Sequence, residues 1–528
     1  MDRRTFLGGT AAAALTTATA GCAGPVPDDH TDRHASAGTP PPSSPPPPRP
    51  TAPAPGGAPT AADWNALAAS LDGTLVRPGD RSWTTARQLY NTRFDTLRPA
   101  AVAYAAHADD IRTALGHARA HGVPVALRGG GHSYAGWSSG DGRLVIDVSA
   151  LDRVRAGGDE AVIGAGAKLI DVYRSLAARG TTLPAGSCPT VGIAGLVLGG
   201  GHGVVSRAYG LTCDHLTGAT LITADGTRLT ADAAENPDLF WALRGAGNGT
   251  FGVVTELRFR TRPAPQAVSA YLTWPWSRAA GLVAAWQRWG PDQPDEIWSS
   301  LHLEAAAGRG PAVSLAAFSL GTLGELQNAV DRLAARAGSS ASHVSFKRRG
   351  YREAMEVYAG CSSFPTDARC HLPGTTPGRA PEGGLARETY AARSDFFDRD
   401  IPAAGVTALL DRLRAVPGGA GSVSLTALGG AVNRVAPTAT AFVHRRSRTL
   451  AQYLASWPAG GDGAASRDWL ASVHGAMRPY ASGAAYQNYT DPDLKDWRTA
   501  YYGDAAPRLT ALKDRYDPDR VFTSPQGL

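Results

Sequence analysis

Short apolar runs alternate with amphipathic stretches in the first half of the chain. The runs Val123–Leu127 and Leu144–Val148 are rich in β-branched residues and predict strands. The stretch Ile111–His121, with its apolar residues on one face, predicts a helix, and a second helix is expected over Lys168–Arg179 with Gly180 at its C-terminal end. This alternation favours an arrangement in which ligand-binding loops follow strands.

A hairpin and a further strand follow in the pattern. The β-rich segments Thr220–Thr223 and Thr227–Leu229 flank an Asp225-Gly226 turn, which is a common two-residue hairpin connection. Val253–Arg260 predicts another strand after a glycine-rich stretch. These elements extend the first β-containing region to about residue 263.

Beyond Pro263 the pattern changes to longer strands mixed with helices. Strands are expected near Leu301 and Ala316, and alternation of polar and apolar residues predicts two more over Ser422–Leu428 and Ala439–His444. A helix carrying Trp286 and Trp289 is expected before these strands, and we expect its tryptophans in a core. Together they predict an antiparallel sheet covered by helices.

Two glycine-rich segments each contain one reactive side chain. The first is Arg128-Gly129-Gly130-Gly131-His132-Ser133-Tyr134, and the second is Gly186-Ser187-Cys188-Pro189-Thr190-Val191-Gly192. Glycine turns expose backbone N–H groups and let a pyrophosphate come close. A lone histidine beside glycines is usually a turn residue, and a lone buried cysteine is usually an inert hydrophobe. Their occurrence together favours a covalently held flavin.

The C-terminal segment strengthens this interpretation. With Ala485-Tyr486-Gln487-Asn488-Tyr489 and Tyr516-Asp517-Pro518, the chain resembles the berberine-bridge-enzyme-like FAD-linked oxidases of the vanillyl-alcohol-oxidase superfamily, from about Asp63 to the C-terminus. The resemblance implies an α+β fold with a two-part FAD-binding domain of the p-cresol-methylhydroxylase type and an antiparallel-sheet substrate domain covered by helices. The expected boundaries are 63–265 for FAD, 266–480 for substrate, and 481–528 for a segment returning to the FAD domain.

The resemblance also assigns residues to the cofactor. It implies an FAD bonded twice, at the flavin 8α carbon by His132 and at C6 by Cys188, whose pKa neighbouring N–H groups are expected to lower. Further cofactor-binding residues are expected at Arg128, Gly129, Gly130, Gly131, Ser133, Val191, Gly192, Gly199, Gly200, Gly203, Gly252, Val254 and Asn488. His202 is expected to be a loop residue without a ligand role, and no metal site is expected.

A Rossmann dinucleotide fold does not fit the same glycines. Gly245-x-Gly247 lacks the helix that should follow it and the acidic residue expected about 20 positions later. The run Gly199–Gly203 has the same defect, so both stretches are interpreted as loops beside the FAD.

Oxidation of an alcohol by a flavin requires a base for the hydroxyl proton. The resemblance points to the tyrosines of Tyr-x-Asn-Tyr, with Tyr486 as the first choice and Tyr489 as the second, although ordinary packing is an alternative for each. Some relatives carry a carboxylate on the strand before a Gly-Gly pair, but Ser422–Gly430 has none. Val191 matches a position at which family oxidases tend to carry valine, which favours O2 as the acceptor.

The expected activity is oxidation of a hydroxyl group of a carbohydrate or secondary metabolite, with hydride transfer to flavin N5 and production of H2O2. A doubly bonded flavin needs no closed pocket, which suits bulky substrates; the substrate class itself rests on analogy. The alternatives are a dehydrogenase with a different electron acceptor and a flavin-bearing binding protein without turnover. The sequence leaves the oligomeric state open.

The N-terminus predicts export. Arg3-Arg4, followed by an apolar run to Ala20, resembles a twin-arginine signal peptide within residues 1–22, although an ordinary basic n-region is an alternative. Cys22 is a candidate for lipidation, which would attach the protein to a membrane at the cell surface; cleavage after Ala20 would release it. Residues 23–62 are expected to form a proline-rich linker without a core.

The net charge and the cysteines bear on possible partners and on disulfide formation. The net charge of +6 is small for 528 residues, and no basic block is interleaved with aromatics, so nucleic acid is an unlikely partner. Cys361 and Cys370 are nine positions apart in a loop and form a plausible disulfide, as suits an exported protein. Cys213 is expected to be a buried structural thiol.

Overall fold

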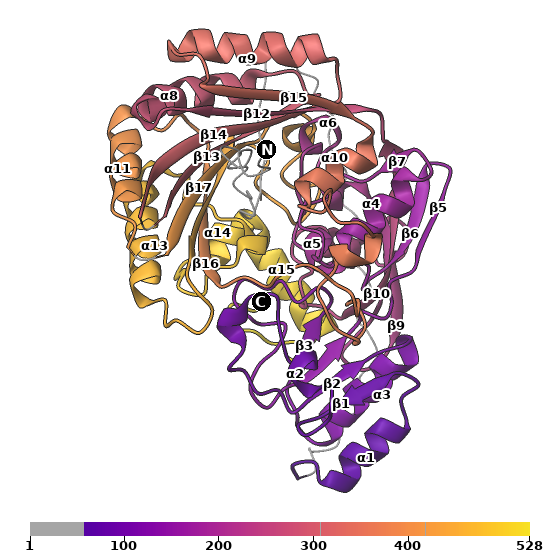
Figure 1. Cartoon of the computed structure of the whole chain (residues 1–528). Coiled ribbons are helices and arrows are strands. Elements are labelled where there is room, and N and C mark those ends of the chain that lie inside the picture. The colour runs from indigo at the N-terminus through magenta and orange to yellow at the C-terminus, as the bar shows by residue number, and fades with distance from the viewer. Residues whose placement is uncertain (1–56, 307, 418) are drawn as a thin grey trace, which may run out of the picture.

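The computed structural model describes residues 57–306, 308–417 and 419–528 (Figure 1). The expected signal peptide, Cys22 and most of the proline-rich linker therefore lie outside the described residues. Within the described part of the chain, none of the helices combines the length and the apolar character that a membrane span requires.

The first sheet is small and mostly parallel. Its strands run in the order β1 (Thr74–Val76), β2 (Ala101–Tyr104), β4 (Leu144–Asp147) and β3 (Val125–Arg128). Only the β1–β2 pair is antiparallel. Three helices precede or connect these strands: α1 (Ala61–Ala69), α2 (Trp83–Ala86) and α3 (Ala108–Ala120). The strands and the helix expected between residues 111 and 148 are confirmed, and the first glycine-rich loop leaves the end of β3.

A five-stranded antiparallel sheet completes the part of the chain that is expected to bind FAD, the FAD-binding part. Its order is β5 (Val154–Gly157), β6 (Glu160–Gly164), β10 (Val253–Arg260), β8 (Leu216–Ile222) and β9 (Arg228–Asp232). The expected hairpin is β8–β9, with Gly226 at φ +86° in the turn. The associated helices are α4 (Leu169–Ala177), α5 (Ile193–Leu198), α6 (Ser206–Tyr209) and α7 (Pro237–Leu243). The short strands β7 (Thr181–Thr182) and β11 (Arg262–Pro263) pair with each other beside it.

The third sheet is large and wholly antiparallel. Its seven strands run in the order β15 (His343–Arg349), β12 (Ala267–Trp274), β14 (Arg309–Ser319), β13 (Ile297–Ala306), β17 (Ala420–Ala427), β18 (Thr449–Ser456) and β16 (Tyr390–Phe397). Four helices cover its outer face in Figure 1: α8 (Ala279–Trp289), α9 (Leu323–Ala337), α11 (Ala403–Arg414) and α13 (Ala464–Met477). Trp286 and Trp289 are buried in the core between sheet and helices, as expected.

The strand expected over Ala439–His444 is wrong. This segment has no sheet partner; instead the N–H groups of Ala441 and Phe442 donate to the carbonyls of Trp241 and Arg244 at the end of α7, at 3.2 and 3.1 Å. Residues 440–442 and 444 are all buried, so this segment has no exposed face of the kind that an alternating strand presents. The strand expected over Ser422–Leu428 is confirmed as β17, and the strand that follows it in the large sheet is β18.

The C-terminal segment joins the FAD-binding part. The helices α14 (Trp497–Tyr502) and α15 (Ala506–Tyr516) follow the large sheet in sequence, yet their apolar side chains belong to the core of the two smaller sheets. Lys513 fixes this return: its ammonium group donates to the carbonyls of Thr250 and Phe522, each at 2.7 Å, and pairs with Asp517 at 2.6 Å. The α+β fold class is confirmed.

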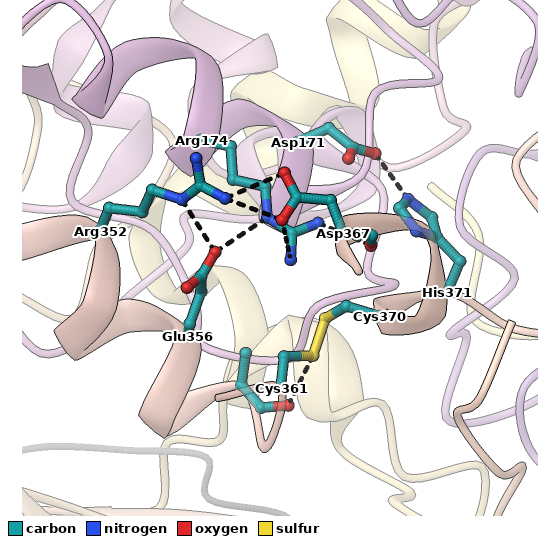
Figure 2. Close-up of a disulfide and its surroundings, with 9 residues drawn as sticks. Asp171, Arg174, Arg352, Glu356, Cys361, Asp367, Cys370 and His371 are labelled. Atoms are coloured by element: carbon teal, nitrogen blue, oxygen red, sulfur yellow. Dashed lines mark hydrogen bonds and ion pairs between the residues drawn. A yellow bond between two sulfur atoms is a disulfide. The ribbon is translucent and has the colours of Figure 1, made fainter. Parts of the chain in front are cut away.

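A strap formed by residues 359–389 runs from α10 (Tyr351–Tyr358) of the substrate part over the FAD-binding part. The expected disulfide Cys361–Cys370 closes its first turn, and both cysteines pack on Ile170 of α4. Figure 2 shows the polar contacts around it: Arg174 of α4 donates to Glu356 at 3.0 Å, and Arg352 pairs with Asp367. Arg174 also donates to the Asp367 carbonyl, and His371 Nε2 lies 2.9 Å from the Asp171 carboxylate, so the strap docks on the helix that supports the second glycine-rich loop.

We predict that removing this disulfide lowers stability without abolishing the fold. A cross-link that closes a loop of about ten residues contributes on the order of 2–3 kcal/mol, mainly by restricting the unfolded chain. Urea unfolding of the C361S/C370S double variant should therefore show a free energy of unfolding lower by about that amount. Dithiothreitol should destabilise the wild-type protein to the same level and leave the double variant unchanged; equal sensitivity of both would contradict the assignment.

Candidate active site

The two glycine-rich loops lie backbone against backbone. A Cβ on Gly130 would collide with the amide of Gly192, and a Cβ on Gly192 would collide with the amide of Gly130. Gly131 has φ +70°, a conformation that favours glycine. Only this approach of two bare backbones brings His132 and Cys188, from loops far apart in sequence, to the same cavity.

The first turn of helix α4 supports the second glycine-rich loop through hydrogen bonds. The N–H groups of Leu169 and Ile170, in its first turn, donate to the carbonyls of Val191 and Pro189 at 3.0 and 3.1 Å. The preceding residue, Lys168, is buried, and its ammonium group donates to the carbonyls of Gly129 and Gly166, both at 3.0 Å. One short segment thus anchors both loops.

A second buried cation lies at the start of the first loop. Arg128 at the end of β3 forms an ion pair with Asp147, and its Nη2 donates to the hydroxyl of Tyr104 at 3.4 Å. Its Nη1 is buried and has no partner among the described residues. A buried donor of this kind is costly unless an acceptor reaches it, so it indicates an acceptor supplied by a ligand.

The His132 ring is held by a hydrogen bond at its edge and by an aromatic ring stacked on its face. Its Nε2 lies 2.8 Å from the hydroxyl of Thr190, two residues after Cys188, and its ring stacks on Tyr90 with centroids 4.0 Å apart. Burial, reinforced by the positive charge of Lys168, lowers the pKa of His132 to about 3. The imidazole is therefore neutral at neutral pH and has a lone pair for bond formation.

The environment of Cys188 contradicts the expected thiolate. Burial raises the pKa of this thiol to about 12, and the nearby carboxylate of Glu388 acts in the same direction. Burial outweighs any help from neighbouring N–H groups, so the thiol is protonated before it meets a cofactor. Glu388 itself, which comes from the strap and hydrogen-bonds Tyr90, has a pKa raised by burial.

A cavity of about 350 Å³ connects these groups. The predicted site residues that line it come from both glycine-rich loops, from β10 and the residue before it, and from the C-terminal segment: Arg128, Gly129, Gly130, Gly131, His132, Ser133, Cys188, Val191, Gly192, Gly203, Gly252, Val254, Tyr486, Asn488 and Tyr489. Gly199 and Gly200 are not in the cavity wall. They lie behind it, where a Cβ would collide with Asn488 and Phe442 respectively.

The two candidate tyrosines have different partners. The Tyr486 oxygen accepts hydrogen bonds from the Gly201 N–H and from Asn488 Nδ2, each at 2.9 Å, while burial raises its pKa above the ordinary value. The Tyr489 hydroxyl lies 3.0 Å from His202 Nε2, and its ring stacks on Tyr134 at 5.2 Å between centroids. The Tyr486 oxygen therefore meets two N–H donors, whereas the Tyr489 oxygen meets a titratable imidazole.

The sequence alone missed several of these partners. His202, which the sequence places only in a loop, lines the cavity, and its Nδ1 is buried without a partner among the described residues. Gln452 of β18 donates to the Tyr134 hydroxyl at 2.7 Å, and Tyr90 and Glu388 enter from elements without any recognisable motif. On the large sheet, the sequence had singled out only the segment around β17, Ser422–Gly430, because it carries no carboxylate.

These residues fit an FAD. The paired glycine loops leave bare backbone beside the cavity, and Arg128 and Lys168 place positive charge beneath it. Arg128 Nη1 and His202 Nδ1 are buried polar atoms without a partner among the described residues. A nucleophilic imidazole and a thiol share its wall. Nothing in the donor set around the cavity suggests a metal ion, because its histidine, cysteine and tyrosine groups pair with other residues or are spread along the wall.

Comparison with known proteins agrees with this fit. Sequence families described as "FAD binding domain" and "Berberine and berberine like" match residues 99–232 and 485–528. The uncharacterized FAD-linked oxidoreductase YgaK of Bacillus subtilis strain 168 is 32% identical over 465 residues, which cover 87% of this chain and 97% of that protein. The chitooligosaccharide oxidase of Gibberella zeae is 29% identical, covering 85% of this chain and 91% of its own.

Solved structures show the same relationship. Physcomitrella patens BBE-like 1 superimposes with a TM-score of 0.79 at 30% identity, over 88% of this chain and 98% of that chain. The fold and the matched sequences define an FAD-linked oxidoreductase. More particularly, the chain belongs to the berberine-bridge-enzyme-like family, with a p-cresol-methylhydroxylase-type FAD-binding domain and a berberine-like C-terminal segment.

We predict that Gly130→Ala prevents normal flavin retention. The added methyl group must separate the two loops, and overpacking of this kind costs about 1–3 kcal/mol. The purified variant should show a clearly reduced ratio of flavin to protein absorbance. Gly116→Ala is the matched control, because this glycine of α3 has free space around it and alanine favours a helix; equal flavin content in both variants would contradict the role of the Gly130–Gly192 contact.

Proposed function

We propose that the protein is an exported oxidase in which FAD is bonded to both His132 and Cys188, and that it oxidises a hydroxyl group of a carbohydrate or secondary metabolite. The observation that carries the proposal is the meeting of a neutral imidazole, a thiol and a tyrosine–histidine pair on one cavity. The FAD would accept the hydride at N5 and pass the electrons to O2 with formation of H2O2.

In this proposal, separate residues of the chain bind the cofactor and accept the substrate proton. The paired glycine loops and the buried cations hold the diphosphate region, and His132 and Cys188 fix the ring. Tyr489 is better placed than Tyr486 to take the substrate proton, because both N–H donors already occupy the Tyr486 oxygen, whereas Tyr489 has a proton-accepting neighbour. This reverses the preference that the sequence motif alone suggested.

The substrate class rests on the site and on relatives. Tyr134, which lines the cavity, stacks on Tyr489 and accepts a hydrogen bond from Gln452 of β18. Its hydroxyl is a polar group beside Tyr489, which suits a polyhydroxylated substrate. A chitooligosaccharide oxidase is among the similar proteins. Oligosaccharides are therefore the first compounds to test.

Export is part of the same proposal. The N-terminal signal predicts it, and the Cys361–Cys370 disulfide supports an oxidising compartment. Lipidation of Cys22 would attach the protein to the membrane surface, and the proline-rich linker would then hold the enzyme away from it.

The covalent attachment of FAD at two residues can be tested by mass spectrometry. We expect denatured, digested protein to yield one species joining the peptides of His132 and Cys188 through a single FAD. H132A should leave the Cys188 link and C188A the His132 link, while the double variant should release all flavin on denaturation. Free FAD from the wild-type protein, after expression with adequate flavin, would overturn the double attachment.

The tyrosine assignment can be tested by the rate of flavin bleaching. A panel of oligosaccharides and alcohols should bleach the flavin without oxygen, and air should restore the colour with H2O2. We predict that Y489F slows bleaching by about 10²–10⁴-fold, the usual contribution of a positioned base, and that Y486F slows it less. A larger loss in Y486F would transfer the role to Tyr486, and colour restored without H2O2 would favour a different acceptor.

A further inference from the structure

His202 is the only other imidazole in the described wall of the cavity besides His132. It lies in the loop after α5, with 8% of its surface exposed, and its Nε2 is 3.0 Å from the Tyr489 hydroxyl. Its ring also meets the Tyr486 ring, with centroids 5.3 Å apart. A buried imidazole thus lies directly behind the tyrosine to which the proposed function gives the substrate proton.

The charge state of His202 suits an acceptor. Burial alone lowers its pKa to about 4, and no charged side chain contributes to the shift, so the ring is neutral at neutral pH. The titratable groups facing it are Tyr489 and Tyr486. A neutral imidazole has one nitrogen with a lone pair and one N–H, and can therefore take a proton from a phenol at Nε2 while Nδ1 keeps its hydrogen.

The second nitrogen also indicates a ligand. His202 Nδ1 is buried and has no partner among the described residues. An unsatisfied buried donor costs about 1–3 kcal/mol, and a ligand acceptor in the cavity would remove that cost. The imidazole therefore contacts Tyr489 through one nitrogen, while its other nitrogen is open to a ligand in the cavity that both residues line.

The nearby carboxylate does not compete for this role. Glu388 hydrogen-bonds Tyr90, beside His132, and it does not contribute to the pKa shift of His202. The segment Ser422–Gly430 of the large sheet carries no carboxylate at all. His202 is a titratable group with a hydrogen bond to Tyr489, since its Nε2 lies 3.0 Å from the Tyr489 hydroxyl.

We propose that His202 is the proton acceptor of Tyr489 during substrate oxidation, an inference that rests on the proposed function. The substrate C–H bond breaks and its hydride goes to flavin N5, so the substrate carbon is oxidised and the flavin reduced. The substrate O–H proton passes to the Tyr489 oxygen as the Tyr489 proton passes to His202 Nε2. O2 then takes the two electrons, and the protons leave in H2O2.

Charge compensation makes this transfer feasible. An imidazolium in this buried loop has no carboxylate partner, which disfavours it in the resting enzyme. A bound flavin would gain negative charge with the hydride, and in a low-dielectric site a nearby opposite charge would favour the imidazolium. Proton transfer to His202 is therefore coupled to reduction and reversed on reoxidation.

The first experiment is a pH profile of anaerobic flavin reduction in the holoenzyme. In the wild-type protein the rate should fall on the acid side as His202 becomes protonated, near its pKa of about 4. H202Q should slow reduction by at least about tenfold, lose this acid limb and speed up with rising pH as hydroxide replaces the acceptor. A wild-type rate and profile in H202Q would overturn the proposal.

A matched control separates chemistry from folding. His444 is also buried and neutral, with its Nε2 bonded to the Tyr501 carbonyl at 3.0 Å, but it is not in the cavity wall. H444Q should change thermal stability and leave the acid limb in place. If H202Q does not fold, H202N serves the same purpose.

A second measurement needs no substrate. Nitrogen-15 NMR of histidine-labelled holoprotein should show one imidazole, absent from the H202Q or H202N spectrum, that changes from neutral to cationic when dithionite reduces the flavin. An unchanged neutral signal in a flavin-loaded protein would overturn the role of His202 alone. A protein that holds no flavin would overturn the proposed function itself, so the two failures are distinct.

Discussion

The close approach of Gly130 and Gly192 is the contact on which the site depends. Neither position has room for a Cβ, because each glycine faces the backbone amide of the other. Through this contact a loop at the end of a parallel strand and a loop at the start of α4 become one wall. Lys168 then binds the first loop through the Gly129 carbonyl, and the next two residues bind carbonyls of the second loop. The strap docks on α4 through the hydrogen bond from Arg174 to the Asp367 carbonyl. The reactive side chains are thus positioned by backbone packing, which tolerates little movement.

Burial, more than pairing of charges, sets the reactivity of the cavity. It keeps His132 and His202 neutral and Cys188 protonated. A neutral imidazole is ready to form a bond or accept a proton, whereas the thiol must lose its proton to the reaction itself. Attachment at Cys188 is therefore the more demanding of the two proposed bonds, and His132, held by Thr190 and Tyr90, is the better prepared nucleophile.

Local patterns predicted the glycine loops, the strands β3, β4, β8, β9 and β10 of the smaller sheets, and the helices at 111–121 and 168–179, because these depend on residues close in sequence. The C-terminal tyrosines were found through a motif. The partners were not, because His202 meets Tyr489, and Tyr90 and Glu388 meet beside His132, only after the sheets and the strap have assembled. The error at Ala439–His444 has a similar origin, because this segment bonds to the end of α7, a contact between distant segments.

The pairing of each tyrosine determines how a proton can move through the site. Two N–H donors hold the Tyr486 oxygen, and they can only stabilise its charge; they cannot take its proton. The hydrogen bond between Tyr489 and His202 joins two groups that both gain and lose protons. In a cavity whose neighbouring sheet segment Ser422–Gly430 offers no carboxylate, this pair supplies a route for one proton without leaving a permanent buried charge.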